Sequence, residues 1–252
     1  MAIALVTGST SGIGAAFAER LAARGYDLVL VARTVPRLEA QADQLRHRYG
    51  GTVEVLPADL ADPLALLEIE ARLAAEPFDL LVNNAGFGTN RRFADGAIDE
   101  EERQLDVLVR AVLRLTHAAV GPMIRRGSGA VINVSSVAAF VPGGTYAAAK
   151  AWVTYFSEGL AGELEGTVVK VMAVCPGFTH TEFHERGGMD VSAIPERLWL
   201  TPDEVVDGAL ADLARGRRVS IPSGTYKVLA TVARHAPHRL VTAVYSRARP
   251  KR

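Results

Sequence analysis

The sequence predicts an α/β fold, with one doubly wound, mainly parallel seven-stranded sheet and helices on both of its faces in a single domain. Three observations predict it. Short apolar runs alternate with helical patterns along all 252 residues. The runs are almost continuously apolar, which is typical of parallel strands that are covered on both faces. A glycine-rich turn directly follows the first run, where such sheets bind ligands.

The expected strands are short, and each is bounded by turn-forming or polar residues. Their ranges are 3–6, 28–32, 53–56, 79–82, 130–134, 168–174 and 218–222. Right-handed crossovers between successive strands then build a single sheet. No internal repeat or low-complexity linker divides the chain, so one domain over residues 1–252 is the expected organisation.

Helical patterns fill the intervals between these strands. Gly25 is a suitable C-cap for the first helix, and Pro36 is a suitable first residue for the second. The expected helices span 15–25, 36–51, 62–77, 100–127, 145–166 and 202–214. A basic amphipathic segment at 224–247 belongs to a C-terminal extension, 224–252.

Charge and cysteine content exclude several classes of protein. The formal net charge is zero, so nothing in the balance indicates nucleic-acid binding. The chain has one cysteine, Cys175, and therefore no intramolecular disulfide, which favours a reducing compartment. The N-terminus does not resemble a signal peptide, and no apolar run reaches the ~18 residues of a membrane span. We expect a cytoplasmic protein.

The C-terminal extension is basic, because no acidic residue follows Asp212. Contact with an anionic membrane is one reading of this segment. The preferred reading is that its apolar residues pack on the same or a neighbouring subunit and leave the charges in water, so no membrane partner is expected.

The turn after the first strand reads TGSTSGIG, residues 7–14. Gly8 allows a tight turn, Gly12 allows close approach of the backbone to a pyrophosphate, and Gly14 allows close helix packing. The helix that follows offers free N–H groups and the positive end of its dipole. In this strand–turn–helix setting the turn predicts dinucleotide binding, whereas no motif of an ATPase phosphate loop occurs.

The chain resembles the short-chain dehydrogenases/reductases in four motifs that occur in the order of that family. They are TGSTSGIG (7–14), NNAG (83–86), YAAAK (146–150) and PGFTHT (176–181). The order of elements also matches from residue 3 to about residue 222. The resemblance implies a Rossmann-type NAD(P)-binding domain, hydride transfer between a nicotinamide and a carbonyl or secondary alcohol substrate, and a homodimer or homotetramer.

The second strand indicates which dinucleotide is preferred. An acid at its end would bind the ribose 2′-hydroxyl of NAD, but Ala32 stands there and Arg33 follows. A guanidinium is suited to a 2′-phosphate, so NADP is expected to be preferred over NAD. The alternative is that Arg33 is an ordinary solvent-exposed residue of a loop and has no role in cofactor binding.

The resemblance places Asp59 beside the adenine, Asn83, Ala85 and Gly86 beside the adenosine ribose, and Thr181 beside the nicotinamide carboxamide. The full expected set of cofactor-binding residues is Gly8, Ser9, Thr10, Ser11, Gly12, Ile13, Gly14, Arg33, Asp59, Leu60, Asn83, Ala85, Gly86, Tyr146, Lys150, Pro176, Gly177, Thr179 and Thr181.

Tyr146 and Lys150 are four residues apart and share one face of a helix. A free phenol has a pKa near ~10, and a nearby cation lowers it by stabilising the phenolate. By resemblance, Tyr146 exchanges a proton with the substrate oxygen, Lys150 tunes Tyr146 and binds the nicotinamide ribose, and Ser136 orients the substrate oxygen. Motif alignment selects Ser136 over its neighbour Ser135.

Leu108 departs from the family pattern. The family usually has an asparagine at this position, which supports a water in a proton path behind the lysine, whereas a leucine side chain cannot hydrogen-bond. Two functions therefore stay open. One is an NADP-preferring oxidoreductase, and the other is a cofactor-binding regulatory or scaffold protein with little turnover.

The segment 178–200 corresponds to the substrate lid of the family. Aromatic residues there and at strand ends suggest a hydrophobic substrate. His180 and His184 lie four residues apart in the lid, but no further ligands with metal-site spacing accompany them, so no metal is expected. Substrate identity, stereochemistry and reaction direction do not follow from the sequence.

Overall fold

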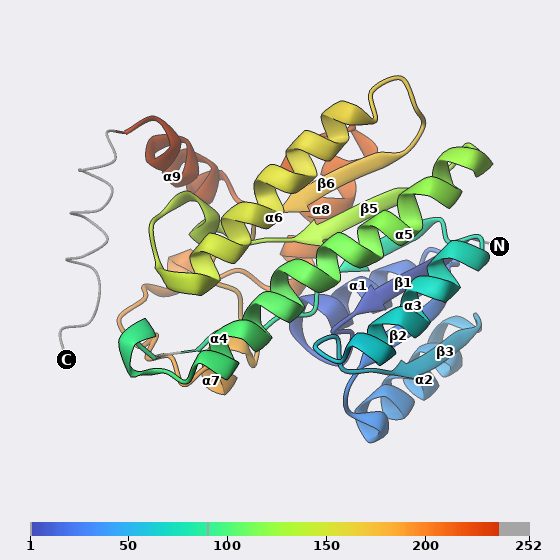
Figure 1. Cartoon of the computed structure of the whole chain (residues 1–252), viewed down its shortest axis with the longest axis horizontal. Coiled ribbons are helices and arrows are strands. Elements are labelled where there is room, and N and C mark those ends of the chain that lie inside the picture. Colours follow the sequence, from blue (N-terminus) through green and yellow to red (C-terminus); the bar gives the residue numbers. More distant parts are fainter. Residues whose placement is uncertain (1, 90, 237–252) are drawn as a thin grey trace.

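A computed structural model describes residues 2–89 and 91–236 of the chain. Its centre is a seven-stranded sheet with the strand order β3-β2-β1-β4-β5-β6-β7 (Figure 1). Every strand pair is parallel. The chain order reverses between β1 and β4, and this topological switch point is where open α/β sheets bind ligands. The predicted fold class is confirmed.

The strands lie close to their predicted ranges. The last strand is the exception, because only two of the five residues at 218–222 pair with β6. The strands are β1 Ile3–Thr7, β2 Asp27–Ala32, β3 Val53–Pro57, β4 Leu80–Asn83, β5 Ala130–Val134, β6 Lys170–Val174 and β7 Val219–Ser220.

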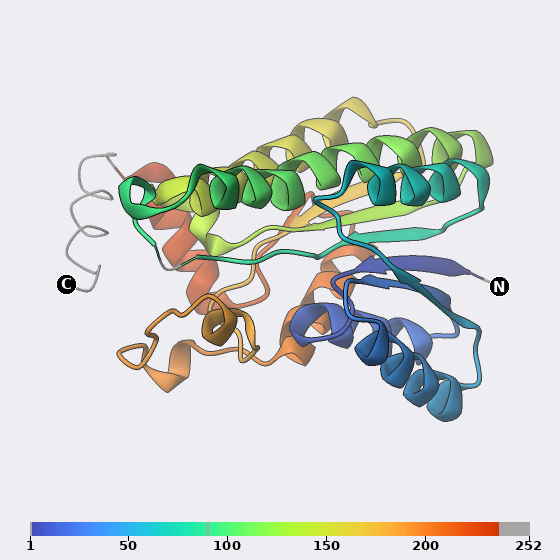
Figure 2. The same ribbon diagram turned by 60° about the horizontal axis from the view of Figure 1, so that its bottom comes forward.

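Helices cover the sheet in two layers. Figure 2 separates them: α3, α5 and α6 lie on one face, and α1, α2 and α8 lie on the other. The α-helices are α1 Gly12–Ala22, α2 Val35–Tyr49, α3 Pro63–Ala75, α4 Ile98–Leu105, α5 Ala111–Arg126, α6 Gly144–Glu163, α7 Phe183–Arg186, α8 Pro202–Ala214 and α9 Gly224–His235. Short 3₁₀ turns occur at Phe93–Asp95 (η1), Val137–Phe140 (η3) and Glu196–Leu198 (η4).

Two apolar cores hold these layers on the sheet. Phe17, Leu21 and Leu38 fill the core beneath α1, α2 and α8. Leu66 and Leu115 belong to the core beneath α3, α5 and α6. Because side chains of each strand point alternately to both faces, both layers need apolar strand residues. This explains the continuous apolar runs in the sequence.

The helix expected over residues 100–127 is not uniform. A π-helical turn, η2 (Asp106–Arg110), separates α4 from α5, and the N–H of Ala111 bonds to the carbonyl of Asp106. This i→i+5 bond widens the helix by one residue at Leu108, which is fully buried. The stretch Ile98–Arg126 is long and apolar enough to span a membrane, but half of its most apolar window is buried within the protein, as in a core helix.

The C-terminal helix α9 packs against the base of the lid through Tyr226. A Cβ atom on Gly177 would lie 2.0 Å from the Tyr226 ring, so only glycine permits this contact. The Tyr226 hydroxyl accepts a hydrogen bond from the N–H of Phe178 (3.1 Å) and donates one to the carbonyl of Leu198 (2.8 Å). One hydroxyl thus joins both ends of the lid. The expected amphipathic segment 224–247 continues beyond residue 236, outside the described residues.

Replacing Tyr226 with phenylalanine should loosen the lid while keeping the ring in place. Two partly buried backbone groups, the N–H of Phe178 and the carbonyl of Leu198, would lose their partner. We expect a loss of about 1–3 kcal/mol in the free energy of unfolding by urea titration. Amide exchange at Phe178 should also accelerate.

The control is Tyr155→Phe, since the side chain of Tyr155 is 71% exposed. It should change stability by no more than about 0.5 kcal/mol. Unchanged exchange at Phe178 in Tyr226→Phe would contradict this role of the hydroxyl.

Candidate active site

The glycine turn packs against the end of β4 more closely than side chains would allow. Gly8 and Gly12 have φ angles of 63° and 55°, in the left-handed region that glycine adopts without strain. A Cβ atom on Gly8 would lie 2.8 Å from the Cα of Ala85. A Cβ on Gly14 would lie 2.2 Å from the carbonyl oxygen of Gly8. The three glycines therefore bring the start of α1 onto the sheet edge, as predicted.

Asn84, which the sequence prediction did not select, fixes this turn. Its Nδ2 donates to the carbonyl oxygens of Thr7 (3.0 Å) and Gly8 (3.1 Å). The hydroxyl of Thr7 accepts hydrogen bonds from the N–H groups of Asn84 and Ala85. In the sequence, only the NNAG motif indicates a role for Asn84. The motif does not show which of its two asparagines contacts the glycine turn.

The first asparagine of the motif, Asn83, has its side chain inside the protein. Its Nδ2 donates to Thr116 Oγ1 (3.1 Å) and to Asn133 Oδ1 (2.9 Å), while Asn133 donates to Ser157. All four residues are buried. The network ties β4 and β5 to α5 and α6, so the side chain of Asn83 serves the strands rather than the groove beside the turn.

Several features around the turn suit an anionic dinucleotide. Ser11 precedes α1 and makes no side-chain capping bond, so the first N–H groups of the helix are not capped by it. The hydroxyl of Ser9 is buried and has no hydrogen-bond partner among the described residues. Arg33 is exposed at the end of β2. The close glycine approach and the helix terminus fit the pyrophosphate of a bound dinucleotide, and the cation fits a 2′-phosphate on its adenosine ribose.

Three other residues predicted to bind the cofactor, near the carboxyl edge of the sheet, already interact with the protein itself. Asp59 is paired with Arg103 (2.5 Å) and accepts a bond from the N–H of Ala61. Burial acts to raise the pKa of the Asp59 carboxyl, but these two hydrogen bonds bring it below the usual value. Leu60 and Ile13 have side chains in the two cores, which leaves their backbone groups for a ligand.

The PGFTHT motif links the catalytic loop, the glycine turn and the lid. The carbonyl of Pro176 accepts a bond from the N–H of Val137 (2.9 Å), just after Ser136. The side chain of Thr179 is buried and donates to the carbonyl of Gly177. A Cβ on Gly12 would lie 2.7 Å from Cγ2 of Thr181. Thr181 therefore stands directly against the glycine turn, and its expected place beside a nicotinamide carboxamide stays a prediction.

The three predicted catalytic residues come together at the start of α6. The ammonium nitrogen of Lys150 lies 5.8 Å from the centroid of the Tyr146 ring and donates to the carbonyl of Val134 (2.7 Å). The side chain of Ser136 lies near the phenol of Tyr146 and acts to lower its pKa. Ser135, in contrast, is buried and donates to the carbonyl of Lys150 (2.7 Å). The geometry therefore agrees with the choice of Ser136 over Ser135.

Burial governs the protonation of this site. It raises the pKa of Tyr146 to about 12, although the side chain of Ser136 acts in the opposite direction. It also lowers the pKa of Lys150 to about 8. In the protein alone, the phenol of Tyr146 is therefore less acidic than a free tyrosine, although Lys150 lies 5.8 Å from its ring; the expected lowering of its pKa by Lys150 and an oxidised nicotinamide stays a prediction.

Leu108 lies directly behind this pair. A Cβ on Gly86 would be 2.9 Å from Cδ2 of Leu108 and 3.7 Å from the nitrogen of Lys150. The leucine thus occupies apolar space beside the lysine, at the widened turn of η2. The position where the family has an asparagine side chain offers no hydrogen-bonding group here.

The lid carries a cluster of rings that reaches the catalytic tyrosine. The centroid of the Phe183 ring lies 5.7 Å from that of Tyr146. Trp199 contacts the rings of Phe178, His180 and His184, with centroid distances of 5.6, 4.7 and 5.2 Å. Burial lowers the pKa of His184, which favours the neutral imidazole. The part of the lid that lies next to Tyr146, the ring of Phe183, is therefore apolar.

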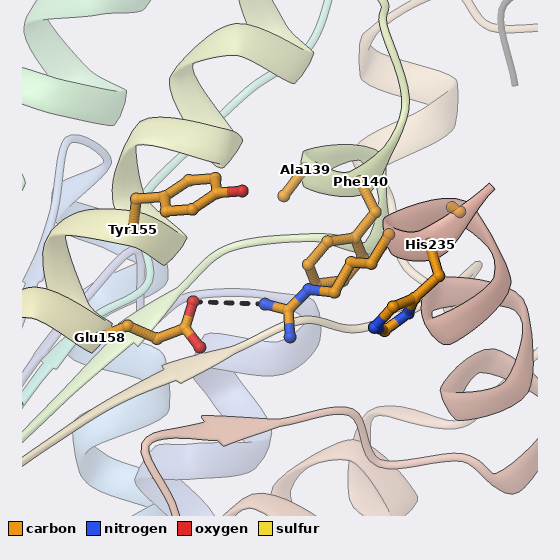
Figure 3. A pocket seen from close by; sticks show the side chains of 7 residues that line it. Ala139, Phe140, Tyr155, Glu158 and His235 are labelled. Carbon is orange, nitrogen blue, oxygen red and sulfur yellow. Dashed lines mark hydrogen bonds and ion pairs between the residues drawn. The ribbon is translucent and has the colours of Figure 1, made fainter. Parts of the chain in front are cut away.

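A separate cavity of about 470 Å³ lies between η3, α6 and α9 (Figure 3). Arg234 crosses it, with its guanidinium 4.6 Å from the Phe140 ring centroid and 3.2 Å from Glu158. Neither Ser136, Tyr146 nor Lys150 lines this cavity. These contacts hold α9 against the loop that carries Ser136. Within residues 2–89 and 91–236, no group of three His, Cys, Asp or Glu side chains is arranged to bind a metal.

Comparison with known proteins connects this site to one family. The family model described as short chain dehydrogenase matches residues 2–190. A short chain dehydrogenase of Pseudocercospora fijiensis is 39% identical over 191 residues, which are 71% of this chain and 60% of the relative. The chain thus spans less than two thirds of that longer protein.

Two solved structures are similar over the whole chain. A short-chain dehydrogenase from Sphingobium yanoikuyae, in complex with NADPH, has a TM-score of 0.86 and 36% identity and covers 100% of this chain and 98% of its own. A bulky-bulky ketone specific alcohol dehydrogenase from Comamonas testosteroni has a TM-score of 0.81 and 32% identity. The similarity covers 100% of this chain and 96% of that protein. The chain belongs to the short chain dehydrogenase family, whose members are NAD(P)-dependent oxidoreductases acting on CH–OH and C=O groups.

Proposed function

We propose that this protein is an NADP-preferring oxidoreductase that interconverts a hydrophobic ketone and the corresponding secondary alcohol. The observation that carries the proposal is the meeting of Ser136, Tyr146 and Lys150 beside the glycine turn. Gly86 connects the two parts, because it follows the Ala85 that packs on Gly8 and lies next to Lys150. A dinucleotide on the turn therefore has the phenol and the ammonium group within the same cleft.

The residues that would hold the dinucleotide are those of the turn, together with Arg33 and Thr181. When bound, the nicotinamide donates or accepts the hydride, and its oxidised form adds a positive charge to the site. The exposed Arg33 suits a 2′-phosphate because its guanidinium is permanently charged and forms bidentate bonds. The relative from Sphingobium yanoikuyae, solved with NADPH, supports the same preference.

The catalytic residues of the chain divide the proton chemistry among them. In the direction of reduction, the phenol of Tyr146 donates its proton to the carbonyl oxygen while Ser136 hydrogen-bonds that oxygen. A pKa raised to about 12 keeps Tyr146 protonated at neutral pH, which suits this acid role. In the direction of oxidation a second positive charge must stabilise the phenolate, and Lys150 contributes by its position 5.8 Å from the ring.

The substrate class follows from the lid. Phe183 lies against Tyr146, and a Cβ on Gly88 would be 2.4 Å from Cε of Met189. Phe183 thus offers an apolar ring beside the phenol, with Met189 close to Gly88 on the same part of the lid, so a substrate gains by burying hydrocarbon there. The bulky-bulky ketone specific relative supports this proposal. We also propose that the protein is cytoplasmic and forms a homodimer or homotetramer.

One alternative is a cofactor-binding regulatory or scaffold protein with little turnover. Leu108 favours it, because the leucine removes a hydrogen-bonding side chain behind Lys150. The retained Ser136, Tyr146 and Lys150, which lie near one another at the start of α6, favour catalysis. Oxidation of NADPH with a panel of bulky ketones and aldehydes distinguishes the two functions. Binding of NADPH without any turnover on the panel would favour the alternative.

Replacement of Tyr146 by phenylalanine tests the proton-transfer role. The variant keeps the ring contact with Phe183 but lacks the proton donor, so kcat for ketone reduction should fall about 10²–10⁴-fold. The dissociation constant for NADPH should stay within a factor of about two, because the phenylalanine leaves the glycine turn intact. Steady-state kinetics and fluorescence titration measure the two quantities. Undiminished turnover in this variant would refute the mechanism.

Replacement of Arg33 by alanine tests the cofactor preference. Loss of a charge-assisted hydrogen bond to the 2′-phosphate should weaken NADPH binding about ten-fold and leave NADH binding unchanged. Arg24→Ala is the matched control, since Arg24 is also exposed but follows the C-terminal end of α1. Isothermal titration gives both dissociation constants. Tighter binding of NADH than NADPH in the wild type, unaffected by the Arg33 change, would overturn the preference.

A further inference from the structure

The first turn of the lid is joined to the dinucleotide-binding half of the molecule at three points. Thr181 packs on Gly12, as the 2.7 Å approach of a Cβ there shows. Glu182 accepts a hydrogen bond from Arg37 of α2, with 3.0 Å between Nη1 and Oε2. Arg186 pairs with Glu182 and also donates to the hydroxyl of Ser11 (3.4 Å).

These contacts come from three different parts of the chain. Arg37 lies in the first turn of α2, just beyond the end of β2, and Ser11 lies immediately before α1. Helix α7, which carries Arg186, directly follows Glu182 and lies beyond the carboxyl ends of the strands (Figure 2). Glu182 is bonded to both guanidiniums, so it is the central member of the group.

The opposite side of α7 contacts the catalytic half of the site. Phe183 lies against Tyr146, and a Cβ on Gly88 would be 3.0 Å from its ring. A Cβ atom on Gly187 would lie 3.0 Å from the carbonyl oxygen of Gly88, so the backbones of these two residues approach closely. One short helix therefore bridges the glycine turn and the proton donor.

We propose that Glu182, Arg37 and Arg186 form a clasp that closes the lid over the bound dinucleotide and sets the rate at which the dinucleotide leaves. The inference rests on the proposed function, because it requires a dinucleotide on the glycine turn. Thr181 and Arg186 contact that turn at Gly12 and Ser11, so a dinucleotide bound between the turn and the lid can leave only when they move. Glu182 is thus a positioning residue, which acts through the lid and not on the reacting atoms.

The ion pairs of the clasp are weak enough for the lid to open and close reversibly. The three side chains are 43–52% exposed, so water and salt screen them. The hydrogen bond from Arg37 is the largest influence that lowers the pKa of Glu182, and the carboxylate is therefore charged throughout the physiological range. Exposed ion pairs contribute modestly, which corresponds to a change of about two- to five-fold in a rate constant.

The experiment measures the dissociation rate of the dinucleotide by stopped-flow fluorescence. The full-length protein, loaded with NADPH or with NADH, is mixed with an excess of the oxidised form. Glu182→Gln and Arg37→Gln should each accelerate release about two- to five-fold for both dinucleotides. The double variant should release no faster than the faster single variant, because both changes break the same interaction. KM for the dinucleotide should rise in parallel, while the rate of hydride transfer in a single turnover stays unchanged.

Asp207→Asn is the matched control. It breaks another exposed ion pair, with Arg20 (2.9 Å), between α1 and α8 and away from the lid. Release from this variant should equal that of the wild type. Salt provides a second test with NADH, which lacks the 2′-phosphate: higher ionic strength should accelerate its release from the wild type but not from the double variant.

Three outcomes separate the clasp from its alternatives. Wild-type rates in Glu182→Gln, with normal dinucleotide binding, would overturn the clasp and leave the proposed function intact. Acceleration confined to NADPH and to Arg37→Gln would also overturn it, because Arg37 would then act on the 2′-phosphate alone. A wild-type protein that binds neither dinucleotide would overturn the proposed function itself.

Discussion

The poor hydration of two ionisable groups, the buried Lys150 and the partly buried Tyr146, one helical turn apart on α6, is the constraint on which the site depends. Burial raises the pKa of the phenol to about 12 and lowers that of the ammonium group to about 8. Lys150 is held by the carbonyl of Val134, and Ser136 is held by the loop that α9 supports. The site therefore keeps a protonated phenol in an apolar cleft, which is a suitable starting state for protonating a carbonyl oxygen.

The glycine turn, where we propose that the dinucleotide binds, lies next to these residues. Gly8 and Gly14 allow backbone contacts that no other residue would permit, and Asn84 fixes the turn with two side-chain hydrogen bonds. In the proposed reaction, oxidation of an alcohol would need a phenolate, and the positive charge that a bound oxidised nicotinamide supplies would offset the effect of burial. We therefore propose that cofactor binding and the acidity of Tyr146 are coupled.

The fold and the principal site residues could be predicted from the sequence because they depend on local patterns. Apolar runs indicated the strands, and spacing placed Tyr146 and Lys150 on one helix face. The remainder depends on contacts between distant segments. Tyr226 meets the lid only after the chain has closed, the direction of the Tyr146 pKa reflects burial by several elements, and the pairing of Arg37 with Glu182 joins residues 145 positions apart. The π-helical turn at Leu108 also had no signal in a pattern that is continuously helical.

The most direct test of this account is a spectrophotometric pH titration of tyrosinate, taken as the difference between the wild type and Tyr146→Phe, with and without saturating NADP⁺. Without the dinucleotide, Tyr146 should ionise near the value of about 12 that burial gives it. With NADP⁺ bound, its pKa should fall well below that value, because a second cation then stabilises the phenolate. The same pKa in both states would contradict the coupling between cofactor charge and the catalytic phenol.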